Sequence, residues 1–148
     1  MATMGGERVF VDTNVLVHAA VPTSPVHASA RNALRSLHGA RAELWISRQV
    51  IREYLAVLSR TQTYARPVPM AALVEDCQRF EQTFKVAHET NAVTRVLLEI
   101  VQSAVVAGKQ VHDASIVATI RSYGIRKLLA HNADDFKRFS DLITVLVL

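Results

Sequence analysis

The chain alternates short runs of consecutive apolar residues with longer stretches in which apolar residues recur every three or four positions. The short runs predict strands over residues 8–12, 43–47, 84–87, 127–130 and 142–148. The longer stretches predict helices over residues 14–20, 25–39, 48–60, 70–82, 91–107 and 111–123, with a short helix at 134–139. Ser24 and Ser47 are candidate N-caps, and Gly39, Gly108 and Gly124 are candidate helix ends.

Strands that are separated by helices imply a parallel sheet covered on both faces. The predicted fold is therefore α/β, a three-layer α/β/α sandwich with a central, mainly parallel sheet, formed by residues 1–148 as one domain. In sheets of this kind, functional side chains gather at the carboxyl ends of the strands. Asp12 lies at the end of the first predicted strand.

The amino-acid composition limits which binding partners and which cellular compartment we expect. The chain has 17 Lys and Arg against 13 Asp and Glu, a formal net charge of +4, which favours polyanionic partners. Cys77 is the only cysteine, so an intrachain disulfide and a cysteine-cluster metal site are excluded. No apolar run is long enough to span a bilayer, and the first residues lack a signal-peptide pattern, so we expect a cytoplasmic protein with no membrane partner.

Several carboxylates occupy positions where the pattern predicts burial or the carboxyl edge of the sheet. Asp113 shares a helix face with apolar residues, Glu53 borders the apolar stripe of its helix, and Asp134 and Asp135 follow the fourth strand. Each has an ordinary structural explanation when taken alone: Asp12 or Asp135 as a helix cap, Glu53 as an ion-pair partner of Arg48 or Arg52. Several carboxylates at one edge would repel one another, and a divalent cation removes that repulsion. Oxygen-only ligands favour Mg²⁺ or Mn²⁺ over Zn²⁺.

Other chemistries fit the sequence poorly. A phosphoaspartate phosphatase requires a second Asp two residues after the first, where Asn14 stands. No glycine-rich phosphate loop is present, and Ser115 near His112 lacks the nucleophile elbow of a hydrolase. The six histidines show no metal-ligand spacing.

Four segments, "FVDTNVLV", "SRQVIREYLAVL", "VHDASIVATI" and "KLLAHNADDFKRF", follow one another in an order that resembles the PIN-domain nucleases, and among them the VapC-type toxin ribonucleases of bacterial toxin–antitoxin systems. The resemblance covers almost the whole chain. It implies an acidic pocket made of Asp12, Glu53, Asp113 and Asp135, in which Thr13 and Asn14 support the first Asp through their hydroxyl and amide groups. Two positions depart from the family pattern, because Ala130 replaces a frequent Thr or Ser and Asn132 stands where some members have Asp. The fourth acidic position is therefore open between Asn132, Asp134 and Asp135, and we select Asp135 because it directly precedes Phe136.

The resemblance implies an Mg²⁺- or Mn²⁺-dependent endoribonuclease with an antitoxin protein as its partner, working as a homodimer. Asp12 and Asp113 would be the main metal ligands, while Glu53 and Asp135 would hold metal-bound waters or a second ion. Outside these four acids, nine acidic residues face 17 basic ones, so the rest of the protein is strongly basic. Arg48, Arg52 and Lys109 are the candidate contacts to RNA phosphates. Two alternatives stay open: a PIN-domain nuclease for RNA processing without an antitoxin, and a catalytically idle PIN fold that binds RNA or protein.

Overall fold

The computed structural model describes residues 6–148 and contains a five-stranded sheet in the order β3-β2-β1-β4-β5. Its strands are β1 (Arg8–Val11), β2 (Glu43–Ser47), β3 (Lys85–Ala87), β4 (Lys127–Ala130) and β5 (Thr144–Val147). All four neighbouring pairs run parallel, so the predicted parallel sheet is confirmed. The expectation that the chain begins without a signal peptide concerns residues 1–5 in part, and these lie outside the described residues.

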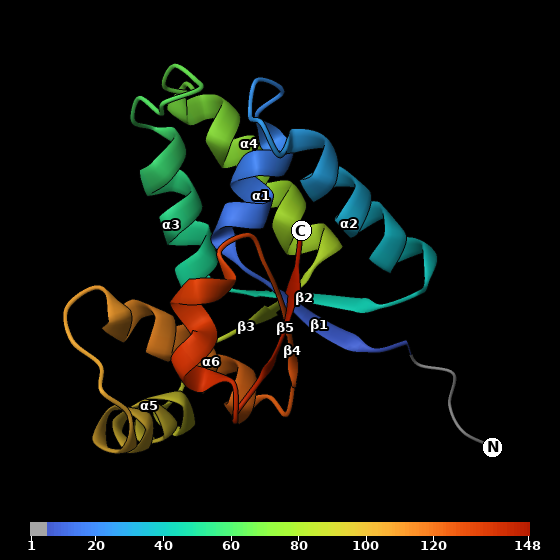
Figure 1. Ribbon diagram of the computed structural model, residues 1–148. Helices are drawn as coiled ribbons and strands as arrows, with labels where there is room; N and C mark the ends of the chain where they lie inside the picture. The colour runs from blue at the N-terminus through green and yellow to red at the C-terminus, as the bar shows by residue number, and fades with distance from the viewer. Residues whose placement is uncertain (1–5) are drawn as a thin grey trace.

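Helices cover both faces of the sheet, which confirms the predicted three-layer sandwich (Figure 1). On one side lie α1 (Thr13–Ala20), α2 (His27–Gly39), α3 (Arg48–Leu58) and α4 (Met70–Thr83). On the other side lie α5 (Asn91–Ser103) and α6 (Gln110–Ser122), followed by the short 3₁₀ helix η1 (Ala133–Phe139). Across residues 6–148, no helix is long and apolar enough to cross a bilayer.

Three helix boundaries differ from the predicted ones by two or more residues: the start of α2, the end of α5, and the end of α3, which comes at Leu58 instead of residue 60. Helix α2 begins at His27, because Ser24 forms a local turn in which its hydroxyl accepts a hydrogen bond from the Val26 N–H at 3.2 Å. Helix α5 ends at Ser103, four residues earlier than its apolar pattern predicts. Beyond it, the backbone oxygen of Val105 accepts a 2.7 Å hydrogen bond from the Arg138 guanidinium, which ties this segment to η1. A tertiary contact therefore ends the helical pattern there.

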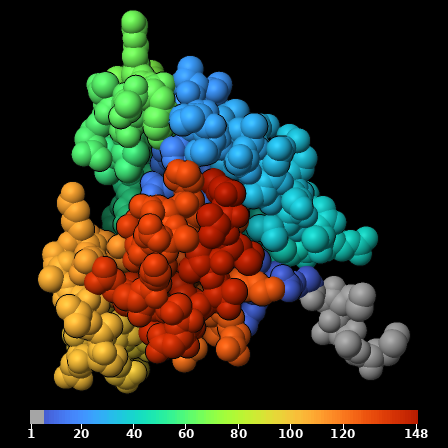
Figure 2. Space-filling view, viewed as in Figure 1, coloured from blue at the N-terminus to red at the C-terminus, as the bar shows by residue number. Residues whose placement is uncertain are grey.

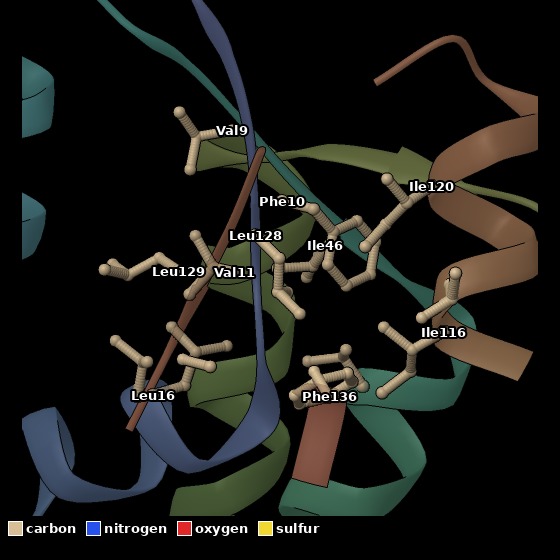
Figure 3. Packing of buried hydrophobic residues seen from close by; sticks show 14 of the residues in the cluster. Val9, Phe10, Val11, Leu16, Ile46, Ile116, Ile120, Leu128, Leu129 and Phe136 are labelled. Carbon is tan, nitrogen blue, oxygen red and sulfur yellow. The ribbon is translucent and has the colours of Figure 1, made fainter. Parts of the chain in front are cut away.

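The two faces of the central strands are both buried, as their continuous apolar runs predict. Figure 3 shows one set of side chains packed together on the α6 side of the sheet: Phe10, Ile46, Leu128, Ile116, Ile120 and Phe136. It shows the opposite face of the same strands turned toward α1: Val9, Val11, Leu129 and Leu16. This packing fixes the strands against each other and thereby fixes where each strand ends.

The strand ends place helix beginnings side by side at the carboxyl edge of the sheet. The Asp12 N–H donates a 2.9 Å hydrogen bond to the Leu129 oxygen, which extends the pairing of β1 with β4 by one residue. Helix α1 begins at the next residue, Thr13. Helix α3 begins directly after β2, where the Ser47 hydroxyl caps it by accepting from the Val50 N–H at 3.3 Å. This edge therefore brings the first turns of α1 and α3 next to the end of β4.

Candidate active site

Asp12 is a buried carboxylate at the junction of β1 and α1, with 6% of its surface exposed. Its side chain forms no capping hydrogen bond to α1, so helix capping does not explain its position. The pKa of Asp12 is raised to about 7, mainly by burial and in addition by the charges of Glu53, Asp113 and Asp135, while a hydrogen bond with the Thr13 backbone acts in the lowering direction. The folded chain thus holds a carboxylate whose ionised form is only partly compensated.

Glu53 lies on α3 and has both carboxylate oxygens fixed by hydrogen bonds. Its Oε2 accepts from the Thr13 hydroxyl at 2.7 Å, and its Oε1 accepts from the Gln49 Nε2 at 2.7 Å. The same Gln49 nitrogen donates to the His112 backbone oxygen at 3.0 Å, which connects α3 to α6. Glu53 is therefore held by its neighbours in the site rather than by the ion pair with Arg48 or Arg52 that would have given it a purely structural role.

Asp113 lies in the first turn of α6 and is half-buried. Burial raises its pKa to about 6, and the charges of Asp135 and Glu53 act in the same direction, whereas Arg138 and His112 lower it. Asp12 and Asp113 thus share two acidic neighbours although they come from distant parts of the chain. The four predicted acids form one electrostatically coupled group.

Three candidates for the fourth acidic position lie at η1, and all are exposed: Asn132, Asp134 and Asp135. Only Asp135 contributes to the pKa shifts of both Asp12 and Asp113. Its own N–H donates to the Asn132 oxygen at 3.3 Å, which is a backbone contact of the short helix. Among the three, the electrostatic coupling favours Asp135.

The two residues expected to support Asp12 behave differently from that expectation. The Thr13 hydroxyl donates to Glu53 instead of Asp12, because Thr13 already belongs to the first turn of α1 and reaches across to α3. Asn14 is half-buried, and among the described residues its amide forms no hydrogen bond with Asp12. Asp12 is therefore left without the side-chain hydrogen bonds that were predicted for it.

The three basic residues predicted to bind RNA have different surroundings. Arg48 forms an ion pair with Glu81 at 2.9 Å, and Arg52 forms one with Glu89 at 2.6 Å. Lys109 is exposed directly before α6. Both ion pairs are solvent-exposed, so they are worth little energetically and an RNA phosphate can compete for the arginines. Their role in RNA binding stays a prediction.

A cavity of about 460 Å³ opens beside Glu53, between α3, α5 and α6. It is lined by Gln49, Arg52, Glu53, Glu89, Val93, Thr94, Leu97, His112 and Ser115. Figure 2 shows blue N-terminal residues between the green residues and the orange and red residues of the C-terminal third, so distant parts of the chain meet on this side of the molecule. Gln49 was missed from sequence, although its place four residues before Glu53 puts both on one helix face.

The donor set fits a hard divalent cation. Carboxylate oxygens are the ligands that Mg²⁺ and Mn²⁺ prefer. A cation would compensate the burial of negative charge, and the repulsion between carboxylates, that together raise the pKa of Asp12 and Asp113. Within residues 6–148, no three His, Cys, Asp or Glu side chains already stand as a ready-made metal cage. Mg²⁺ usually keeps several waters and takes only one or two protein carboxylates, so such a cage is not required.

Comparison with known proteins shows which sequences and folds are similar to this chain. Ribonuclease VapC48 of Mycobacterium tuberculosis is 26% identical over 133 residues, which are 88% of this chain and 91% of that protein. The fold is also similar to VapBC2 from Rickettsia felis bound to a promoter DNA fragment (TM-score 0.68, 19% identity, 95% and 98% of the two chains). It is similar to the sarcin–ricin loop cleaving toxin VapC20 of M. tuberculosis as well (TM-score 0.65, 21% identity, 86% and 92% of the two chains). The PIN domain family model matches residues 9–142, nearly the whole described chain, and the protein therefore belongs to the PIN domain family.

Proposed function

We infer that this protein is a metal-dependent endoribonuclease and the toxin of a toxin–antitoxin pair. The observation that carries the inference is the buried Asp12, whose pKa is raised by burial and by three further carboxylates of the site. Such a group is unfavourable in a structural role and suits a cation site. Similarity to proteins named ribonucleases supports RNA as the substrate.

Asp12 and Asp113 would hold Mg²⁺ or Mn²⁺, and Glu53 and Asp135 would bind its waters or a second ion. When bound, the ion supplies positive charge that stabilises the negative charge developing on the scissile phosphate. The chain's own residues prepare this site. Thr13 and Gln49 fix both oxygens of Glu53, which holds that carboxylate in one orientation before any ligand arrives. Asp12, whose pKa is raised to about 7, would give up its proton on binding a cation.

An antitoxin partner and a homodimer are the expected assemblies. Solved structures with this fold include a toxin–antitoxin complex from Klebsiella pneumoniae and VapBC-1 from nontypeable Haemophilus influenzae. This chain presents exposed apolar side chains on α4, namely Met70 at 51% and Val74 at 44% exposure. An apolar helix surface of this kind is suited to contact with another protein.

An RNA-cleavage assay in Mg²⁺ tests the catalytic part. We expect Asp12→Asn and Asp113→Asn each to lower the cleavage rate about a hundredfold or more, since each removes a ligand charge. The matched control is Asp141→Asn, which removes an exposed carboxylate outside the site. Wild-type rates in both site variants would show that the assignment is wrong.

A growth assay tests the toxin part. Expression of the wild-type chain in bacteria should arrest growth, while expression of Asp12→Asn should not. Co-expression of an antitoxin encoded by a neighbouring gene should restore growth. That antitoxin should also co-purify with the wild-type chain. RNA cleavage without growth arrest would instead favour a PIN-domain nuclease that processes RNA and has no antitoxin.

A further inference from the structure

The four acids of the site create a charge problem for an RNA substrate. One divalent cation neutralises only half of the charge of four ionised carboxylates, so the site stays negative where an anionic phosphate must approach. Two of the arginines predicted to bind phosphates, Arg48 and Arg52, already have carboxylate partners, Glu81 and Glu89. A cationic side chain that lies beside the acids and has no carboxylate partner would remove this repulsion.

Arg138 lies on η1, three residues after Asp135. Side chains three positions apart eclipse one another on a 3₁₀ helix, so Arg138 and Asp135 share one face of η1. Besides burial, which has the largest effect on the pKa of Asp113, the charge of Asp135 raises this pKa and the charge of Arg138 lowers it. Since η1 packs against α6, both side chains lie close to the first turn of α6, which carries Asp113.

The Arg138 guanidinium is anchored through one nitrogen and otherwise free. Its Nη1 donates a 2.7 Å hydrogen bond to the backbone oxygen of Val105, in the segment between α5 and α6. A guanidinium has five N–H groups, and its remaining ones contact no acceptor within residues 6–148. Arg138 is exposed and forms no ion pair with any carboxylate that the structure describes. It therefore presents unused donors next to the acidic group.

We propose that Arg138 binds the scissile phosphate of the RNA through its free N–H groups, beside the cation held by Asp12 and Asp113. The proposal rests on the ribonuclease function proposed above. The planar guanidinium matches two oxygens of a phosphate and forms charge-assisted hydrogen bonds with them. The anchor on Val105 restricts the side chain before the substrate arrives, so less conformational freedom is lost on binding. A fixed positive charge at this place also stabilises the charge that develops on the phosphate during cleavage.

Two neighbouring basic residues of η1 provide a matched comparison. Arg138→Gln and Lys137→Gln each remove one positive charge from an exposed side chain, but Lys137 is not on the face of η1 that carries Asp135. In Mg²⁺ we expect kcat/KM to fall about a hundredfold in Arg138→Gln and by less than about twofold in Lys137→Gln. Arg138→Lys keeps the charge without the planar fork, so kcat/KM should fall about tenfold.

A purely structural role for Arg138, as the tether of the segment before α6, predicts a different result. Loss of a tether would lower Tm and activity but would not change the number of phosphates in contact with the protein. Binding of a single-stranded oligoribonucleotide is therefore measured at several salt concentrations on the slowly cutting Asp12→Asn background. The slope of log affinity against log salt should become shallower by about 0.7 in Arg138→Gln and should not change in Lys137→Gln or Arg138→Lys. An unchanged slope in Arg138→Gln would overturn the proposal.

A single uncharged linkage in the RNA locates the contact. The cut site of an oligonucleotide is mapped with the wild type, and a methylphosphonate then replaces the phosphate at that site. On the Asp12→Asn background, this replacement should weaken binding about tenfold when Arg138 is present and by less than about threefold in Arg138→Gln. Equal weakening in both proteins would overturn a contact between Arg138 and the scissile phosphate.

The outcomes separate this proposal from the proposed function. Absence of metal-dependent cleavage by the wild type would overturn the ribonuclease function, while the salt slopes would still test whether Arg138 binds an RNA phosphate. Cleavage by Arg138→Gln at the wild-type rate would overturn the role of Arg138 and would leave the ribonuclease function intact.

Discussion

The hydroxyl of Thr13 donates a 2.7 Å hydrogen bond to the carboxylate of Glu53, across 40 positions of the sequence. This contact joins the first turn of α1, which follows Asp12, to α3 on the same side of the sheet. With the second oxygen of Glu53 held by Gln49, the carboxylate has little freedom to rotate. The pair therefore couples the position of one site acid to the backbone next to another.

Replacement of Thr13 tests this coupling. Thr13→Val keeps the shape of the side chain but removes the donor, so we expect kcat to fall about tenfold while the free energy of unfolding falls by only about 1 kcal/mol. Thr13→Ser keeps the hydroxyl and should retain most of the activity. Single-turnover cleavage and thermal unfolding of the two variants provide the comparison. An unchanged kcat in Thr13→Val would mean that Glu53 needs no such positioning.

The stability of the metal-free protein should decrease as the pH rises from about 5 to about 8. The pKa values of Asp12 and Asp113 are raised to about 7 and about 6, so the folded state binds more protons than the unfolded state in this interval. Protonation therefore stabilises the fold, and that stabilisation is lost as pH rises through the folded pKa values. We expect a loss on the order of 2 kcal/mol, measured by urea unfolding in a chelator.

Asp12→Asn serves as the control for this pH effect. It removes the larger of the two shifts, so the variant should be more stable than wild type at pH 8 and should have a flatter pH profile. Burial lowers the pKa of His18, which gives a slope of opposite sign in both proteins and cancels in their difference. A wild-type profile that is as flat as the variant's would contradict the shifted pKa of Asp12.

Magnesium or manganese should raise the thermal stability of the wild-type protein. A ligand that binds only the folded state stabilises it by mass action, by about 2.7 kcal/mol at a concentration one hundred times its Kd. Differential scanning fluorimetry at pH 8 should show an increase in Tm with Mn²⁺ that saturates and is reversed by a chelator. Asp12→Asn and Asp113→Asn should show little or no increase, and an equal increase in all three would place the ion elsewhere.

Release of Arg52 from Glu89 should strengthen RNA binding. The two side chains form a 2.6 Å ion pair at the rim of the cavity, and Glu89→Gln leaves the guanidinium free for a phosphate. The slope of log affinity against log salt should then become steeper by about 0.7, the value for one added phosphate contact on a single strand. Glu75→Gln on α4 changes the net charge equally at an exposed position and should leave the slope unchanged.

The strands and most helix boundaries could be predicted because their signals are local. β1 and β4 are buried on both faces and read as continuous apolar runs, while Ser47 caps α3 through its own hydroxyl. The end of α5 could not be predicted, since its apolar pattern continues past Ser103 and a contact between Val105 and Arg138 stops it. The residues around Ser103 in the sequence do not include Arg138, so a local pattern cannot predict this helix end.

The same contrast between local sequence signals and tertiary contacts applies to the candidate site. Asp12 and Asp113 stood out because each is a carboxylate at a position where the pattern predicts apolar surroundings, and both have raised pKa values in the fold. The ion-pair partners of Arg48 and Arg52 lie 33 and 37 residues further along the chain. A local sequence pattern therefore could not predict these ion pairs. The hydrogen-bond partner of the Thr13 hydroxyl could not be predicted either, because it depends on how α1 packs against α3.

The order of the strands in the sheet affects when the protein can become active during its synthesis. β1 directly precedes Asp12 near the start of the chain, yet one of the two neighbours of β1 in the sheet, β4, is made more than a hundred residues later. Asp113 and Asp135 also belong to this late part. A nascent polypeptide therefore has no complete set of the four acids until translation has passed Asp135, and on the proposed function it stays inactive until then.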